Sequence, residues 1–202
     1  MKLTIHTFLT IDGVMQAPGN PDEDREGNFM HGGWAFAYDD DETSVAIRSW
    51  YERAGAFLFG RRTYELFSNY WPKVTDPNSL IASQLNALPK YVASGTLKTV
   101  DWHPSQLMTD VVREVKALKE QPGDELQVHG SGALARTLIE HDLVDEYHLL
   151  TFPVHLGSGK RLFADGVHPG SLRLLEGRAT KGGIMISSYA PAGPVRYADF
   201  GR

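Results

Sequence analysis

The chain of 202 residues contains no cysteine. This absence excludes disulfide bonds, thiolate zinc sites and cysteine nucleophiles. The chain also lacks an apolar run long enough to cross a bilayer, so no membrane partner is expected. Its first residues are typical of a strand and not of a secretion signal, which favours a cytoplasmic protein.

Positive charge is also in short supply. Lys and Arg number 20 against 25 Asp and Glu, which gives a net charge of -5. Nonspecific nucleic-acid binding depends on many cations, so no nucleic-acid partner is expected. An anionic small molecule would have to be bound by local donors instead. The length and the 42% hydrophobic content suit one globular domain over residues 1–202.

Segments rich in β-branched and aromatic residues alternate with segments of helical periodicity. This alternation predicts an α/β fold of three layers, in which helices flank both faces of a mostly parallel sheet. Residues 171–178 and 183–190 flank a Lys-Gly-Gly turn and predict a C-terminal antiparallel hairpin. Residues 72–88 are expected to form a polar connection, either without regular structure or with one helical turn. The other predicted strands are 2–11, 56–59, 90–93, 126–128 and 146–152, and the main predicted helices are 40–54, 109–120 and 133–141.

A long irregular segment, residues 13–38, follows the first predicted strand and contains several glycines and two prolines. Loops of more than about 12–15 residues are usually functional or disordered. The aromatic side chains Phe29, Trp34 and Phe36 argue against disorder, because they can pack onto other groups. We therefore expect an ordered loop with a function.

Glycine turns after predicted strands provide the strongest functional signal. Residues 128–135 (VHGSGALA) lead from a strand through Gly130, Ser131 and Gly132 into a helix. Glycines allow a phosphate to approach closely, and the free N–H groups and dipole of the helix favour its charge. A tight turn without a ligand is the alternative. No acidic residue follows about 20 residues later, so the segment departs from the Rossmann pattern.

Two further turns have similar chemistry. Gly60, Arg61 and Thr63 follow another strand and form either an anion site or a solvated helix start. Ser94 ends a third strand and is either a phosphate donor or part of a plain turn. Ligands of α/β sheets bind at the carboxyl ends of strands. NADPH is an elongated ligand that would use all three turns, with Arg61 or Arg62 favouring its 2′-phosphate over NADH.

The order of these motifs resembles the dihydrofolate reductase family. Residues 130–163 (GSGALARTLIEHDLVDEYHLLTFPVHLGSGKRLF) are especially similar to the reductase domain of the riboflavin-biosynthesis bifunctional deaminase-reductase. Residues 7–24 (TFLTIDGVMQAPGNPDED) and 31–34 (HGGW) resemble stand-alone bacterial members of that superfamily. The zinc deaminase signature requires cysteines, so only the reductase half is expected here.

This resemblance implies a dihydrofolate reductase-like fold with NADPH in an extended cleft, under a loop that closes over nicotinamide and substrate. The implied substrate is the riboflavin-pathway pyrimidine 5-amino-6-(5-phosphoribosylamino)uracil, a pterin or another small molecule. A homodimer is also implied. The cofactor-binding residues that the resemblance implies are Gly60, Arg61, Thr63, Ser94, Gly130, Ser131, Gly132, Ala133 and Leu134.

Two acidic residues are candidates for catalysis. Asp12 lies where the first strand opens into the long loop, and it either contacts substrate or caps the turn at Gly13. Asp41 lies in an acidic run at the start of the first predicted helix, the helix on which dihydrofolate reductase carries its catalytic acid. This run also has a plain explanation, because acidic residues stabilise helix N-termini.

Substrate contacts are expected from Gln16, Trp34 and Phe152, with core packing as the alternative for the two rings. Lys160 or Arg161 either meets a substrate phosphate or belongs to an exposed basic turn.

His129, beside the glycine turn, is expected to be a packed core residue. No His-x-x-x-His pair occurs on a predicted helix, so no metal is expected. The sequence thus predicts an NADPH-dependent reductase of a small heterocycle. The alternative is a nucleotide-binding protein of the same fold without reductase activity.

Overall fold

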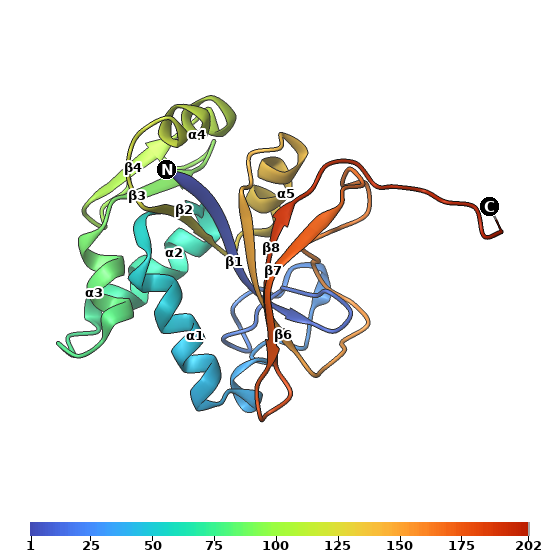
Figure 1. Cartoon of the computed structure of the whole chain (residues 1–202). Helices are drawn as coiled ribbons and strands as arrows, with labels where there is room; N and C mark the ends of the chain where they lie inside the picture. The colour runs from blue at the N-terminus through green and yellow to red at the C-terminus, as the bar shows by residue number, and fades with distance from the viewer. Residues whose placement is uncertain (202) are drawn as a thin grey trace.

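A computed structural model describes residues 1–201 of the chain. They form a sheet of eight strands in the order β4-β3-β2-β5-β1-β6-β8-β7 (Figure 1). The strands from β4 to β6 are parallel, and β8 and β7 add an antiparallel hairpin at one edge. The predicted α/β class, with a mixed sheet and a terminal hairpin, is confirmed. No described helix is long and apolar enough to span a bilayer.

The strands are β1 (Lys2–Thr10), β2 (Ala54–Gly60), β3 (Lys90–Ala93), β4 (Ser105–Met108), β5 (Glu125–His129), β6 (Glu146–Phe152), β7 (Leu172–Ala179) and β8 (Met185–Pro191). The α-helices are α1 (Asp41–Glu52), α2 (Arg61–Tyr70), α3 (Leu80–Ala87), α4 (Val111–Lys119) and α5 (Gly132–Glu140). The short 3-10 helices are η1 (Glu26–Asn28), η2 (Phe36–Tyr38) and η3 (Trp71–Lys73).

Two short elements differ from the sequence prediction, since α3 is longer than the single helical turn allowed there and β4 was not predicted. The polar connection at residues 72–88 contains α3, which buries only Ala82 and Leu85. The edge strand β4 has four residues, of which Met108 alone is buried. Both elements are too short to establish a period of their own, and their place in the fold comes from neighbours distant in sequence.

The sheet separates two kinds of interior. Side chains alternate between its faces along each strand, so Leu3 and Ile5 of β1 pack on one face with α4 and α5, in an apolar core. The opposite face is covered by α1, α2 and α3 and carries a more aromatic core. His6 directly follows Ile5 in β1, so its side chain points to this second face, where it is buried.

Three histidines lie side by side beneath α1. The parallel register places His6 of β1 between His129 of β5 and His148 of β6. Their rings stack, with centroids 5.0 Å apart for His6 and His129 and 4.7 Å apart for His6 and His148. All three are buried, and Tyr51 of α1 stacks on the outer face of His129. His129 is therefore a packed residue, hydrogen-bonded to Gln127 at 3.0 Å.

Burial keeps this row of imidazoles neutral. It lowers the pKa of His6 to about 4, and it lowers the pKa of His129 and of His148 in the same direction. Burial raises the pKa of nearby Glu125. Hydrogen bonds from His6 and Arg53 more than offset this effect and lower the pKa of Glu125 to about 2. The carboxylate thus stays ionised, 2.7 Å from Arg53.

Acid should weaken this fold. Below about pH 6.5 the unfolded chain protonates these imidazoles, whereas His6 stays neutral in the folded protein because its pKa is about 4. The unfolded state then binds more protons, so the free energy of unfolding should fall as the pH decreases from 6.5 to 4. The expected slope is at most about 1.4 kcal/mol per pH unit for each histidine. Urea unfolding at several pH values measures it.

Substitution separates these groups from ordinary surface histidines. His6→Gln should make the slope shallower, because one buried titrating ring is lost. His168→Gln, at an exposed position, should leave the slope unchanged. Identical slopes for the wild type and His6→Gln would contradict the assignment.

Candidate cofactor and substrate site

The three glycine- and serine-containing turns lie together at the carboxyl ends of the parallel strands, which we call the carboxyl edge of the sheet. Strands β3, β2 and β5 are adjacent and parallel, so their carboxyl ends share that edge. Gly60, the last residue of β2, pairs with Ala93, and Ser94 follows directly. Gly130 follows the last residue of β5. The structure therefore brings the predicted turns near residues 60, 94 and 130 into one row.

The hydroxyl of Ser131 joins two of these turns. It accepts a hydrogen bond from the Gly60 N–H at 3.0 Å and lies 2.6 Å from the Thr63 hydroxyl. A Cβ atom on Gly60 would lie only 2.6 Å from the Ser131 Oγ atom, so this close approach requires glycine. Ser131 itself has a left-handed backbone, with φ of 64°. Gly130 has φ of 73°, a conformation that glycine adopts without strain.

Helices α2 and α5 begin at this edge without a side-chain cap. By contrast, α1, α3 and α4 are each capped by a side chain, from Asp40, Ser79 and Asp110 respectively. An uncapped start leaves N–H donors free and carries the positive end of the helix dipole. Among the described α-helices, the two uncapped starts are thus the two that the sequence assigns to phosphate binding. Residues Gly132, Ala133 and Leu134 form the first turn of α5.

Side chains beside the turns add donors. Arg61, at the start of α2, has 46% of its side chain exposed and a single long ion pair with Glu65, at 3.5 Å. Its guanidinium remains accessible to a ligand. The Ser94 oxygen accepts hydrogen bonds from the Thr96 and Leu97 amides, at 3.1 and 3.0 Å. The hydroxyl hydrogen can still donate, either to the Thr96 hydroxyl oxygen at 3.4 Å or to a ligand.

Asp12 connects the turn after β1 to the loop that follows β6. Its carboxylate accepts hydrogen bonds from the Thr10 hydroxyl and from the Leu156 and Gly157 amides, the last at 2.8 Å. The hydrogen bond from Thr10 is the main cause of a pKa lowered to about 2. A carboxylate with these properties holds the loop after β6 and does not donate a proton near neutral pH. Its contacts favour the turn-capping alternative over a catalytic role.

Asp41 is exposed in the first turn of α1. Its neighbour Asp40 caps that helix through the Thr43 amide, at 2.8 Å, and accepts from Gly182 in the β7–β8 turn. The acidic run thus begins a helix and attaches it to the hairpin. A catalytic role for Asp41 stays a prediction.

The expected substrate contacts lie deeper than a surface site requires. Trp34 and Phe152 pack edge to face, with centroids 5.5 Å apart, and are 7% and 1% exposed. Both belong to the core under the segment between β1 and α1, residues 11–40, which we call the lid loop. Core packing, the alternative left open by the sequence, is what the structure shows for the two rings. They offer no surface to a substrate in this conformation.

Gln16 fixes the lid loop. Its amide nitrogen donates to the backbone oxygens of Asp24 and Glu26, at 3.1 and 3.0 Å, and its amide oxygen accepts from the Lys160 N–H at 3.0 Å. Its own backbone oxygen accepts from the Trp34 indole at 2.8 Å. Gln16 lines a pocket, but its polar atoms are engaged within the protein.

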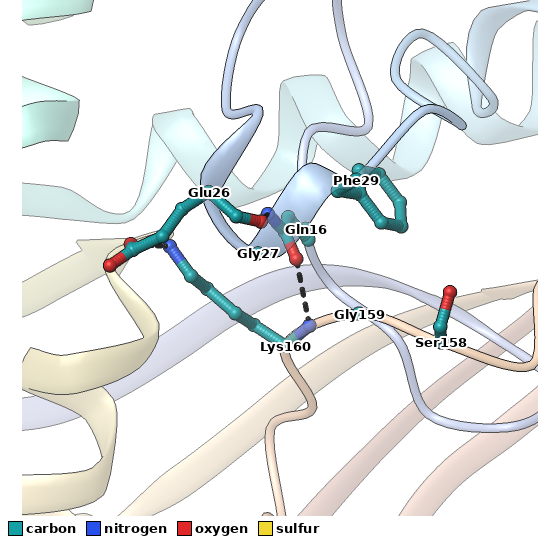
Figure 2. A pocket seen from close by; sticks show the side chains of 7 residues that line it. All are labelled: Gln16, Glu26, Gly27, Phe29, Ser158, Gly159 and Lys160. Atoms are coloured by element: carbon teal, nitrogen blue, oxygen red, sulfur yellow. Dashed lines mark hydrogen bonds and ion pairs between the residues drawn. The ribbon is translucent and has the colours of Figure 1, made fainter.

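That pocket, of about 270 Å³, lies between the lid loop and the loop that follows β6 (Figure 2). Figure 2 shows the Lys160 side chain extended toward the Glu26 carboxylate, with Ser158 farther along the same loop. Lys160 contacts Asp24 and Glu26, which also meet Arg62 of α2. In the sequence, these two acids are not distinguishable from the solvated charges of a loop. The lining residues are Gln16, Glu26, Gly27, Phe29, Ser158, Gly159 and Lys160.

The buried polar layer contains one set of potential metal ligands. Atoms of His6, Glu125 and His148 lie within 4.8 Å of one another. A metal ion must lie near the plane of each imidazole that binds it, about 2.0–2.1 Å from the nitrogen for zinc. The two stacked rings are only 17° from parallel, so no point close to both lies in both planes. The arrangement suits packing and not a shared ion.

The chain is similar to known proteins over most of its length. Residues 1–186 match the family model described as the RibD C-terminal domain. An uncharacterized protein of Bacillus subtilis, YyaP, is 32% identical over 134 residues, which cover 65% of this chain and 71% of that protein.

Solved structures share the fold at low sequence identity. A putative riboflavin biosynthesis protein from Shewanella sp. PV-4 matches with a TM-score of 0.69 and 18% identity, over 95% of this chain and 99% of that one. A pyrimidine reductase-like protein from Corynebacterium diphtheriae gives 0.61 and 13%, over 95% and 92%.

A third structure is a diaminohydroxyphosphoribosylaminopyrimidine deaminase/5-amino-6-(5-phosphoribosylamino)uracil reductase from Thermotoga maritima. It matches with a TM-score of 0.60 and 13% identity, over 95% of this chain and 56% of its own length. These structures confirm the expected dihydrofolate reductase-like fold. Because the family model covers nearly the whole chain, this protein belongs to the RibD C-terminal domain family.

Proposed function

We propose that this protein is an NADPH-dependent reductase of a small heterocyclic substrate. One observation carries the proposal: the uncapped starts of α2 and α5 lie side by side at the carboxyl edge of the sheet, joined through Ser131. Helix starts of this kind bind phosphate groups. Membership of a family named for a riboflavin-pathway reductase domain supports the same conclusion.

The donor set of this edge fits NADPH. The glycine turn at Gly130 and Ser131 and the first turn of α5, Gly132 to Leu134, would hold the pyrophosphate through backbone N–H groups, together with Gly60 and Thr63. Arg61 and Ser94 would meet the 2′-phosphate, since a guanidinium and a hydroxyl both donate to phosphate oxygens. The row of turns then continues toward β1 and β6, where the pocket beside Lys160 would receive the substrate.

The residues of this chain would bind, orient and exclude water. When bound, NADPH supplies the hydride, and the accepting atom pair of the substrate also gains one proton. The lid loop and the loop after β6 close the substrate side, held by Asp12 and Gln16. Since the Asp12 carboxylate is ionised and fully engaged, we assign the proton to solvent.

The biological setting follows from the same proposal. We propose a cytoplasmic enzyme of one domain that acts on a small heterocycle of the pyrimidine or pterin class. The continuous sheet of eight strands supports the single domain. We also propose a homodimer, because edge strand β7 exposes Leu172, Leu174 and Leu175. Sedimentation velocity measures this directly.

A second candidate is a nucleotide-binding protein without reductase activity. The engagement of Asp12 favours it, because the acid expected to act on the substrate is held by the turn instead. Titration with NADPH and NADH, followed by NADPH oxidation across pyrimidines and pterins, distinguishes the two. Binding with oxidation of at least one compound is expected of the reductase. Binding without oxidation of any would favour the second candidate, and binding of neither dinucleotide would contradict both.

The role of Arg61 gives a sharper test. Arg61→Ala should weaken NADPH binding by about tenfold or more, because a charge-assisted hydrogen bond to the 2′-phosphate is lost. NADH binding should change little, since NADH lacks that phosphate. Isothermal titration calorimetry measures both constants.

A matched control exists on α1. Arg48 forms an ion pair with Glu52 at 3.5 Å, four residues apart, as Arg61 does with Glu65. Arg48→Ala should leave both dinucleotides unaffected. Equal losses of NADPH and NADH in Arg61→Ala would remove Arg61 from the 2′-phosphate site.

The contact between the first and third turns can also be tested. Gly60→Ala places a Cβ atom 2.6 Å from the Ser131 oxygen and should force the turns apart. We expect weaker binding of both dinucleotides and a lower melting temperature, because the clash involves two packed turns. Gly170→Ala is the control, since its Cβ atom would meet nothing within 4 Å. Unchanged dinucleotide affinity in Gly60→Ala would show that the spacing of the turns is not important.

A further inference from the structure

The cations around the substrate pocket are already neutralised by the protein. The Lys160 ammonium lies 2.5 Å from the Asp24 carboxylate and 2.6 Å from that of Glu26. Arg62 contacts the same two acids, at 3.3 and 2.5 Å. The next cation along the loop, Arg161, donates to the Asp12 backbone at 2.8 Å and approaches its carboxylate at 3.5 Å. Three cations thus face three carboxylates.

Asp24 and Glu26, which we call the lid acids, are held in place and are not free surface charges. Exposed ion pairs alone contribute little, because mobile side chains and water compete with them. Here, however, the buried Gln16 side chain binds the backbone oxygens of both Asp24 and Glu26 and also the Lys160 amide. The Asp24 side chain is only 18% exposed. The acids are therefore positioned before any ligand arrives.

The ion pair of Glu26 and Lys160 would affect which ligand binds, because both residues line the pocket (Figure 2). A phosphate group carries a charge of about -1.5 to -2 and would need these cations as partners. To reach Lys160 it would have to displace a carboxylate that already satisfies it, and that carboxylate would then repel it. An uncharged ring, with Phe29 as an apolar wall, requires no such displacement.

We infer that Asp24 and Glu26 are specificity-determining residues that make the pocket beside Lys160 select unphosphorylated substrates. They occupy the cations that a phosphoribosyl group would use. This inference rests on the proposed function for the meaning of "substrate", but the charge pairing itself does not depend on turnover. It assigns to this chain an uncharged heterocycle or carbonyl compound and not a sugar phosphate ester.

Binding of a small probe tests the inference without an activity assay. Ribose 5-phosphate and ribose are titrated by calorimetry into the full-length wild type and into Asp24→Asn/Glu26→Gln. The wild type should show no preference for the phosphate beyond that of Lys160→Met, since the free donors of the turns near residues 60 and 130 can also bind phosphate. The double variant should bind ribose 5-phosphate at least tenfold more tightly than the wild type does, because Lys160 and Arg62 are released. Lys160→Met in the double variant should abolish this gain and so place the probe at this pocket.

Two controls guard against indirect effects. Asp22→Asn changes another acid of the lid loop, one that pairs with Arg25, and should leave probe binding as in the wild type. Glu26→Gln alone changes the more exposed acid and should give an intermediate gain even if the double variant folds poorly.

Two outcomes would overturn the inference. One is Lys160-dependent preference of the wild type for ribose 5-phosphate, and the other is the absence of any gain in both acid variants. Neither outcome depends on NADPH. Failure to bind dinucleotides would therefore contradict the proposed function, but the probe titrations could still be interpreted.

Discussion

The candidate cofactor site depends on the single hydroxyl of Ser131. By binding the Gly60 amide and the Thr63 hydroxyl, it sets the distance between two strand-to-helix turns. The same contacts use the oxygen that would otherwise cap α5, so the donors at that helix start stay free. The left-handed backbone of Ser131 costs about 1–2 kcal/mol in a residue other than glycine. Hydrogen bonds across the two turns offset that strain, a pattern common at functional sites.

The sequence could predict the parts of this site but not the contact between them. The turns near residues 60 and 130 each have a local signal, since an apolar strand, a glycine and a helical period occur within about ten residues. The contact of Ser131 with Gly60 requires β2 to lie beside β5, and these strands are far apart in the chain. Alternation of strands and helices predicts a parallel sheet, yet it does not give the strand order. Strand β4 was missed for a related reason, because its position is decided only by pairing with β3.

On the substrate side, the residue types themselves were ambiguous. An aromatic ring suits a hydrophobic core as well as it suits stacking on a ligand, and only tertiary burial decided the matter for Trp34 and Phe152. The same holds for the lid acids. In sequence, Asp24 and Glu26 lie in a charged, glycine-containing loop typical of a solvated surface. Their partners Arg62 and Lys160 come from two distant elements that only the folded sheet brings together.

The two ends of the site differ in how their positive charge is used, and this difference has a physical consequence. At the turns near residues 60 and 130, helix starts keep their donors free and Arg61 is only weakly paired, so a polyanionic cofactor finds unoccupied partners. Beside Lys160, the lid loop supplies carboxylates that satisfy each cation in advance. In a chain of net charge -5, long-range attraction cannot direct an anion to one end or the other. Local pairing differs between the two ends, so under the proposed function it would direct a phosphorylated cofactor to the turns and an uncharged substrate to the pocket beside Lys160.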